Sequence, residues 1–201
     1  SETTPNKEHT YWAYVPEDYN PEHRSGLMVF LHTSDDTMEA AMYRHWKTLC
    51  DQRGIILLAP KAAKLGGWNL DEAEFVKETV EKFTERYAVD PSRVFLHSFS
   101  TGGGFTWQLA FKYRELFHGA AVLSQPLAQR PPENAPSFRQ QFYLSCGEKD
   151  PLLNAVQATV KGLQNMKFPV TFSKDADREH KYPGTEQLLE IARWADALDR
   201  I

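Results

Sequence analysis

The sequence of 201 residues contains little cysteine, no run of basic residues and no long hydrophobic stretch. Its two cysteines, Cys50 and Cys146, are far apart and form no CxxC pair. This spacing argues against a zinc knuckle or a thioredoxin-type site and predicts two separate buried thiols. The formal net charge is −4, so electrostatic binding to nucleic acid or to an anionic membrane is not expected. No apolar stretch approaches the roughly 20 residues that cross a bilayer.

The amino-terminal stretch SETTPNKEHT is polar and lacks the positive start and apolar core of a signal peptide. A mature or excised domain would begin in the same way, so secreted, periplasmic and cytoplasmic locations all stay open. The composition, 41% hydrophobic and 25% charged, is that of an ordinary globular domain. We expect one domain over residues 1–201, either as a whole protein or as one domain of a longer chain.

Strand-like and helix-like segments alternate along the chain. The predicted strands are TYWAYVP, GLMVFLH, GIILLAP, VFLHS, GAAVLS, QFYLSCG and FPVTFS. Apolar residues at helical spacing predict helices over 38–50, 71–87 and 101–116, from Leu153 to Leu163 and from Leu188 to Leu198. VDPSR is expected to be a turn, and the proline-rich residues 125–137 a short loop. The alternation predicts an α/β fold with a mostly parallel sheet, helices on both faces and little or no lid.

Residues 96–110, LHSFSTGGGFTWQLA, have the pattern of a strand, a turn of small residues and a helix. Within them, Ser98-Phe99-Ser100-Thr101-Gly102 is a near match to the nucleophile elbow G-x-S-x-G, with Ser98 replacing the first glycine. Small residues are needed two positions before and after the nucleophile, because strand and helix approach closely there. Such a turn presents the Ser100 hydroxyl at the start of a helix, where the Thr101 N–H faces an oxyanion.

Two further residues complete a constellation around this serine. An activated serine needs a base within hydrogen-bond reach and a carboxylate that orients the base. Asp150 follows the strand QFYLSC, and His180 follows the strand PVTFS. They occur in the order Ser, Asp, His that such folds use, each at the carboxyl end of a strand. The sequence therefore predicts Ser100 as nucleophile, His180 as base and Asp150 as the residue that orients the imidazole.

Four segments carry a resemblance to a known family: YWAYVPEDYNPEHRSGLMVFLH, AVDPSRVFLHSFSTGGG, YLSCGEKDPL and REHKYP. They are similar to the opening strands, elbow, acid strand and histidine loop of the α/β-hydrolase superfamily. The resemblance covers nearly the whole chain and is greatest to compact esterases related to feruloyl esterases, polyhydroxybutyrate depolymerases and the dienelactone-hydrolase and carboxylesterase groups. It implies an α/β-hydrolase fold, the roles given above for Ser100, His180 and Asp150, and an oxyanion hole formed by the backbone N–H groups of Thr101 and Ser34.

Three positions depart from the family pattern. Thr33 stands where the family usually has the glycine of a His-Gly pair, Ser98 replaces the elbow glycine, and Glu179 replaces a glycine that is common before the histidine. A side chain at Thr33, which is expected to lie at the pocket, could displace the Ser34 N–H. Losing one oxyanion donor costs roughly 3 to 4 kcal/mol of transition-state stabilisation.

Other polar residues have simpler interpretations. His32 ends a strand and is expected to support the oxyanion loop. Trp68 either lines an acyl or aryl pocket, as similar positions do in the family, or packs under its loop. HTSDD (32–36) and DADREH (175–180) are expected to be loops near the site, because neither has the spacing of a metal motif. No metal and no cofactor are predicted.

The leading hypothesis is a serine esterase that acts on small or polymer-tethered esters, since the loop 125–137 is too short for a substantial lid. One alternative is a non-catalytic binding domain that retains the triad but has lost the oxyanion geometry, as Thr33 and Ser98 suggest. Another is a phosphate or nucleotide site at the glycine turn, although the Gly-Lys-Ser/Thr of a P-loop is absent. Amide hydrolysis is also open, although peptidases on this fold commonly carry an additional gating domain.

Overall fold

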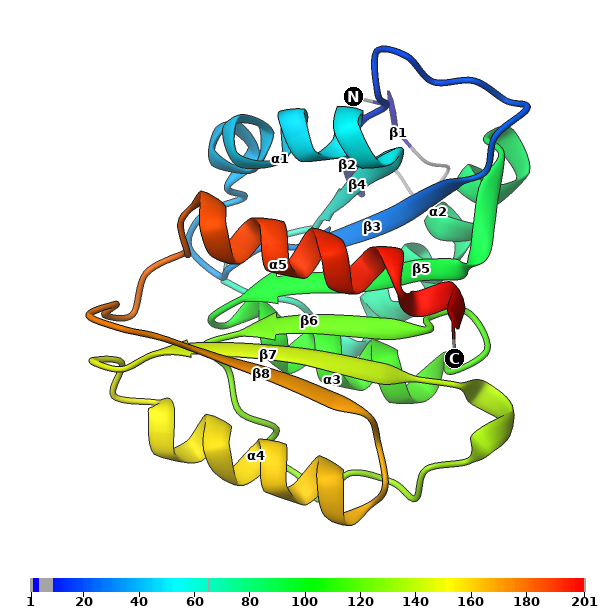
Figure 1. The fold of residues 1–201 in the computed structure, drawn as a ribbon. Coiled ribbons are helices and arrows are strands. Elements are labelled where there is room, and N and C mark those ends of the chain that lie inside the picture. Colours follow the sequence, from blue (N-terminus) through cyan, green and yellow to red (C-terminus); the bar gives the residue numbers. More distant parts are fainter. Residues whose placement is uncertain (1, 4–8, 65, 201) are drawn as a thin grey trace.

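The computed structural model describes residues 2–3, 9–64 and 66–200. Their strands form one sheet in the order β1-β2-β4-β3-β5-β6-β7-β8 (Figure 1). The strands are β1 Glu2–Thr3, β2 Thr10–Tyr14, β3 Ser25–Leu31, β4 Ile55–Lys61, β5 Val89–Phe99, β6 Gly119–Leu123, β7 Gln141–Gly147 and β8 Val170–Asp175. The pairings from β4 through β8 are parallel, whereas β1 and β2 are antiparallel to their neighbours. The prediction of a mostly parallel sheet is confirmed.

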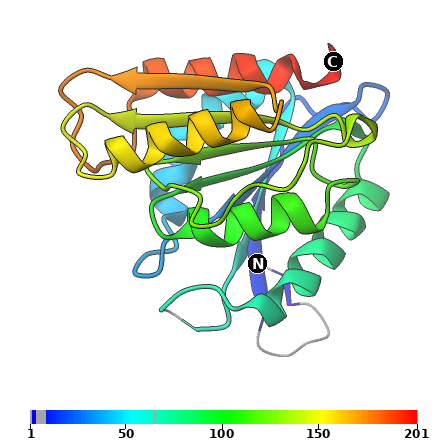
Figure 2. The ribbon, with the colours of Figure 1, turned by 90° about the horizontal axis from the view of Figure 1, so that it is seen from below.

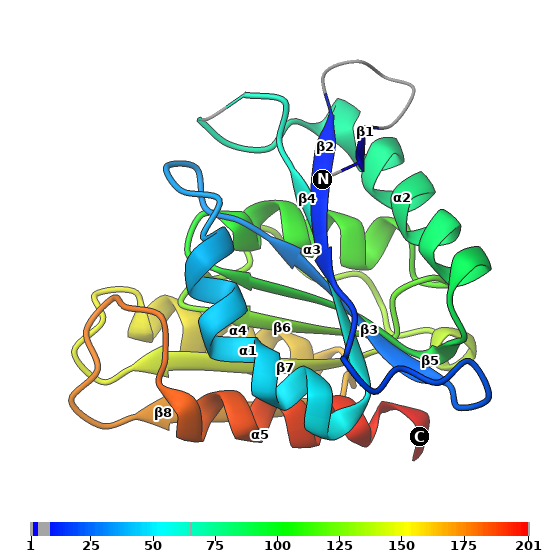
Figure 3. The same cartoon turned by 90° about the horizontal axis from the view of Figure 1, so that it is seen from above.

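Helices cover both faces of this sheet, as predicted. The helices are α1 Glu39–Arg53, α2 Ala73–Arg86, α3 Gly102–Lys112, α4 Leu153–Asn165 and α5 Thr185–Asp196, with short 3-10 turns at Leu70–Glu72, Pro136–Phe138 and Leu198–Arg200. Figures 2 and 3 show α1 and α5 on one face and α2, α3 and α4 on the other. No helix in the described part of the chain has the length and apolarity needed to span a bilayer.

The side chains of the central strands divide between two cores. All seven residues of β3 are buried, and because successive side chains point to opposite faces, they alternate between the cores. Leu27 and Val29 pack on the side of α2 and α3, whereas Met28 and Phe30 pack on the side of α1 and α5. A strand buried on both faces needs such a continuous apolar run, which explains why MVFL has no polar residue.

Two local predictions differ from the structure. VDPSR is not a separate turn but the first part of β5, because Val89 already pairs with Ser25. The Asp90 carboxylate accepts the Ser92 N–H at 3.0 Å, a turn-like contact, and the register with β3 shifts at this point. The helix predicted to reach residue 116 ends at Lys112 instead. Cys50 and Cys146 are buried free thiols, as predicted.

The register aligns the strand ends that carry the predicted site residues. Leu31 of β3 pairs with Ser98 of β5, and Gly147 of β7 pairs with Asp175 of β8. The segments after β3, β5, β7 and β8 therefore leave the sheet on the same side, at the carboxyl ends of the parallel strands, which is the left edge in Figure 1. Ligands bind at this edge in parallel α/β sheets.

Candidate active site

Ser100 occupies a strained turn between β5 and α3. Its φ angle is 52°, in the left-handed region that residues other than glycine rarely adopt. The Ser100 N–H donates to the Leu123 carbonyl at 2.9 Å, and its own carbonyl accepts the Gly103 N–H at 2.9 Å. These bonds hold the backbone in the conformation that the elbow pattern predicts.

The two small residues of the elbow, Gly102 and Ser98, differ in how closely neighbouring atoms approach them. A Cβ atom at Gly102 would collide with the backbone oxygens of Leu31 and His32, so only glycine lets α3 approach β3 this closely. Ser98 is fully buried, and its hydroxyl has no hydrogen-bond partner among the described residues. Serine therefore fits at the first small position of the elbow, but it buries a polar group without compensation.

The structure brings Ser100, His180 and Asp150 together in one hydrogen-bonded chain. Ser100 Oγ lies 2.8 Å from His180 Nε2, and His180 Nδ1 lies 2.9 Å from Asp150 Oδ2. Because a carboxylate only accepts, Nδ1 carries the proton in the neutral ring and Nε2 is left to accept from the serine hydroxyl. In this arrangement His180 can remove the Ser100 proton while Asp150 stabilises the resulting imidazolium.

Asp150 is buried, with 4% of its surface exposed. Burial acts to raise the pKa of its carboxyl group, but hydrogen bonds from the Leu152 N–H, the Ser124 hydroxyl and His180 outweigh it and leave the pKa below its ordinary value. The Leu152 N–H donates to Asp150 Oδ1 at 2.9 Å, which leaves Oδ2 for His180. Asp150 therefore stays ionised as a partner for a histidinium.

The two predicted oxyanion residues contact each other. The Ser34 N–H donates to Thr101 Oγ1 at 2.8 Å, and Thr101 Oγ1 lies 3.2 Å from Ser34 Oγ. Thr33 is buried, and its hydroxyl donates to Asp35 Oδ1 at 2.8 Å, so it turns into its own loop and not toward an open pocket. The Ser34 N–H thus lies beside the elbow, as expected, but it already donates its hydrogen bond to the Thr101 hydroxyl oxygen.

Behind this loop, His32 and Trp68 act as supports. The His32 Nε2 atom accepts the Ala62 N–H at 3.0 Å, so Nδ1 donates to the Thr33 carbonyl at 2.6 Å. Burial lowers the pKa of His32, consistent with a neutral ring. Trp68 donates to the His32 carbonyl at 3.1 Å and stacks on Phe105 with ring centroids 5.0 Å apart. Of the two interpretations of Trp68, these contacts match packing under its loop.

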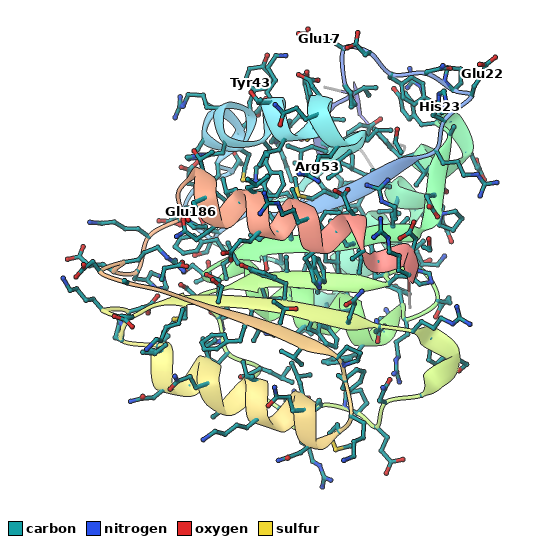
Figure 4. The ribbon with its side chains drawn as sticks, in the orientation of Figure 1. Glu17, Glu22, His23, Tyr43, Arg53 and Glu186 are labelled. Carbon is teal, nitrogen blue, oxygen red and sulfur yellow. The ribbon has the colours of Figure 1, made fainter. Side chains whose placement is uncertain are left out.

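Two open grooves lie near this edge of the sheet. One, of about 440 Å³, runs between α3 and the loop after β6 and includes Gly104, Trp107 and Gln125. The other, of about 870 Å³, lies between β2 and the start of α1 and includes Trp12 and the exposed Tyr43, which Figure 4 shows on the outer side of α1. Neither groove is lined by Trp68 or Thr33.

The arrangement of the whole chain matches solved structures of ester-cleaving enzymes. A ferulic acid esterase superposes with a TM-score of 0.74 at 17% sequence identity, covering 94% of this chain and 92% of that one. A carboxylesterase of Bacillus cereus superposes with a TM-score of 0.71 at 15% identity, covering 96% of each chain. The chain has the α/β-hydrolase fold.

Sequence comparison finds curated relatives of 26 to 29% identity, while no protein-family profile matches the chain. A bifunctional acetylxylan esterase/xylanase of Neocallimastix patriciarum is 29% identical over 186 residues, 87% of this chain and 26% of that protein. A poly(3-hydroxybutyrate) depolymerase of Ralstonia pickettii is 26% identical over 58% of this chain and 28% of that protein. A probable feruloyl esterase C of Aspergillus niger is 28% identical over 57% of this chain and 45% of that protein. This α/β-hydrolase chain thus spans a quarter to a half of the length of these relatives.

The α/β-hydrolase site also contains a buried polar network that the sequence interpretation did not include. Tyr182 lies two residues after His180, and its oxygen accepts the Trp46 indole N–H at 2.8 Å. His97 Nδ1 bonds to the Ala121 carbonyl, so its Nε2 accepts from the Tyr182 hydroxyl at 2.6 Å. Full burial lowers the pKa of His97 to about 4. No periodic pattern in the sequence links His97 to Tyr182.

Glu72 is a second residue that sequence interpretation missed. Its buried carboxylate accepts the Ala63 N–H and the Asn69 N–H, both at 2.7 Å, and so closes the loop between them. That loop carries Trp68, and its Gly66 N–H donates to the Ser34 carbonyl at 2.8 Å. The signal was present in the sequence, because Asn69-Leu70-Asp71-Glu72 has the Asn-x-x-Glu spacing of a capping box.

Proposed function

We propose that this chain is a carboxylic ester hydrolase that works through Ser100, His180 and Asp150. The observation that carries the proposal is the continuous hydrogen-bonded chain from the Asp150 carboxylate through His180 to Ser100, on a serine with left-handed backbone geometry. The α/β-hydrolase fold and the esterases among the relatives support it.

In the proposed reaction, Ser100 Oγ attacks the ester carbonyl carbon while His180 Nε2 takes the serine proton. The negative charge moves to the carbonyl oxygen, where the Thr101 and Ser34 N–H groups stabilise it. The C–O bond then breaks, and His180 returns the proton to the departing alkoxide. Water repeats the sequence on the acyl-enzyme with His180 again as base, which releases the acid and restores Ser100.

The proposed substrates are small esters or esters attached to a polymer. The groove of about 440 Å³ includes Gly104, four residues after Ser100, and it is open, which suits an ester that projects from a larger molecule. The relatives include an acetylxylan esterase and a poly(3-hydroxybutyrate) depolymerase, both named for polymeric substrates. These names support an ester attached to a polymer as the substrate class.

A second candidate, a binding domain without catalysis, is favoured by one observation. The Ser34 N–H is bonded to Thr101 Oγ1, so one of the two oxyanion donors is occupied before a substrate arrives. An ester oxygen would have to displace this hydroxyl. If it cannot, the hydrogen-bonded chain would remain but turnover would be negligible.

Hydrolysis of p-nitrophenyl acetate and butyrate by the wild type and by Ser100→Ala, between pH 5 and 9, tests these candidates. The hydrolase proposal predicts turnover that Ser100→Ala abolishes and stoichiometric labelling of Ser100 by a fluorophosphonate, lost when the protein is denatured. Equal negligible rates together with an unlabelled Ser100 would favour the binding domain.

A further inference from the structure

The loop that carries His180 depends on side chains for its shape. It joins β8 to α5 at the left edge of the view in Figure 1. Most of its residues are exposed, and Glu179 and Lys181 on either side of His180 form an exposed ion pair with each other at 2.6 Å. An exposed pair of this kind contributes little to holding a loop. The position of His180 must therefore be fixed by other residues.

Arg178 supplies the strongest such contacts. Its side chain is only 9% exposed, and each part of the guanidinium has a partner. Arg178 Nε donates to Asp175 Oδ2 at 2.5 Å, Nη2 donates to Ser145 Oγ at 2.6 Å, and Nη1 donates to the Lys181 carbonyl at 2.7 Å. The planar fork thus joins the ends of β7 and β8 to the residue directly after His180.

The backbone of Arg178 makes a second connection, to the turn that carries Asp150. The Lys149 N–H donates to the Arg178 carbonyl at 3.0 Å. Gly147 packs so closely against the same carbonyl that a Cβ atom there would collide with it. Arg178 therefore contacts the residue before Asp150 through its main chain and the residue after His180 through its side chain.

We propose that Arg178 is a positioning residue that sets His180 relative to Asp150 and Ser100, and this inference rests on the proposed hydrolase function. Three fixed hydrogen bonds on one planar group hold the histidine loop in a single conformation against the acid turn. A displacement of about 1 Å in a catalytic group can lower a rate about 100-fold. Loss of the fork should therefore reduce turnover even where the charge is kept.

A matched control exists at another part of the molecule. Arg93 is also largely buried, at 14% exposure, and its Nη2 donates to Asp196 Oδ1 at 2.8 Å. Arg53, labelled in Figure 4, pairs with the same carboxylate near the end of α5. This cluster ties the amino-terminal half of β5 to α5 and contacts none of the three proposed catalytic residues. Arg93→Lys therefore reports the cost of losing a largely buried arginine without any effect on the site.

The experiment compares Arg178→Lys with Arg93→Lys, using kcat and KM for p-nitrophenyl acetate, the thermal midpoint, and the far-downfield proton resonance of the hydrogen bond between His180 and Asp150. That resonance is assigned by its absence in His180→Ala. Arg178→Lys should lower kcat by about 10- to 100-fold with KM within about twofold, and shift or broaden the resonance. Arg93→Lys should lower the thermal midpoint while kcat and the resonance stay unchanged.

If Arg178→Lys does not fold, Ser145→Ala removes the Nη2 partner, together with the bond of 3.1 Å from the Ser145 hydroxyl to Asp175 Oδ2, and keeps the other two bonds of the Arg178 guanidinium. It should lower kcat by a smaller factor in the same direction. The proposal is overturned if Arg178→Lys, or Ser145→Ala in its place, keeps wild-type kcat and the unshifted resonance. Failure of the hydrolase proposal has a different signature, because the wild type itself would neither turn over esters nor label at Ser100. The resonance would then still decide whether Arg178 positions His180.

Discussion

The two sides of the candidate site are built in different ways. On the acid side, Asp150 is buried and holds His180 through a bond of 2.9 Å, while the Leu152 N–H satisfies its other oxygen. On the oxyanion side, the Ser34 N–H is held by the hydroxyl of Thr101, an exposed residue. The difference teaches that Asp150, the proposed charge partner of His180, is fixed by burial before substrate arrives. The Ser34 N–H, a proposed oxyanion donor, becomes available only when a surface hydroxyl moves.

The largest effect should come from breaking the acid side. Asp150→Asn keeps the shape of the side chain but removes the charge that fixes the His180 tautomer and stabilises the imidazolium. We expect kcat for p-nitrophenyl acetate to fall by about 10⁴-fold. Asp177→Asn, on the same loop as His180 but 85% exposed, is the matched control and should leave kcat unchanged. A fall of less than tenfold in Asp150→Asn would mean that the carboxylate does not orient the base.

Acid should weaken the fold through His97, which lies under the histidine loop. Its pKa is lowered by burial from 6.5 to about 4, so between these pH values the unfolded chain binds a proton that the folded chain does not. The contribution of the neutral His97 ring to the free energy of unfolding is complete above pH 6.5. It decreases by about 3 kcal/mol as the pH falls to about 4. In urea unfolding, the stability advantage of the wild type over His97→Asn should shrink by this amount between pH 6.5 and 4. An advantage that is the same at both pH values would contradict the assignment.

The close approach of α3 to β3 gives a paired test of the elbow. Gly102→Ala should lower the free energy of unfolding by about 2 kcal/mol, because its Cβ would collide with the backbone of Leu31 and His32. Gly104→Ala, two residues along the same helix, has no atom within 4 Å of its Cβ and should raise the free energy of unfolding by about 1 kcal/mol. Urea unfolding measures both. Similar shifts in the two variants would show that packing against β3 is not what requires glycine.

The sequence predicted the sheet and the meeting of Ser100, Asp150 and His180, because parallel strands bring their carboxyl ends to one edge whatever lies between them. It did not predict the contacts that support the site. Tyr182 contacts Trp46 and His97, which lie 136 and 85 residues away in sequence, and Arg178 contacts Ser145, which lies 33 residues away. No periodic pattern in the sequence links these pairs. VDPSR was predicted as a turn because Asp, Pro and Ser favour turns, but pairing of Val89 with β3 extends the strand through it.

The smallest effect concerns the oxyanion side and is an increase in activity. In Thr101→Ala, the Ser34 N–H loses the hydroxyl that occupies it at 2.8 Å and becomes available to a carbonyl oxygen. A hydrogen bond of this kind contributes about 1 kcal/mol, so kcat/KM for p-nitrophenyl acetate should rise by up to about fivefold. Ser34→Ala is the control, because it removes the second contact of the Thr101 hydroxyl and keeps the backbone N–H. A decrease in kcat/KM in Thr101→Ala would instead assign the Thr101 hydroxyl itself as a donor to the oxyanion. The acid and oxyanion sides would then both be arranged before substrate binds, and the contrast between them would disappear.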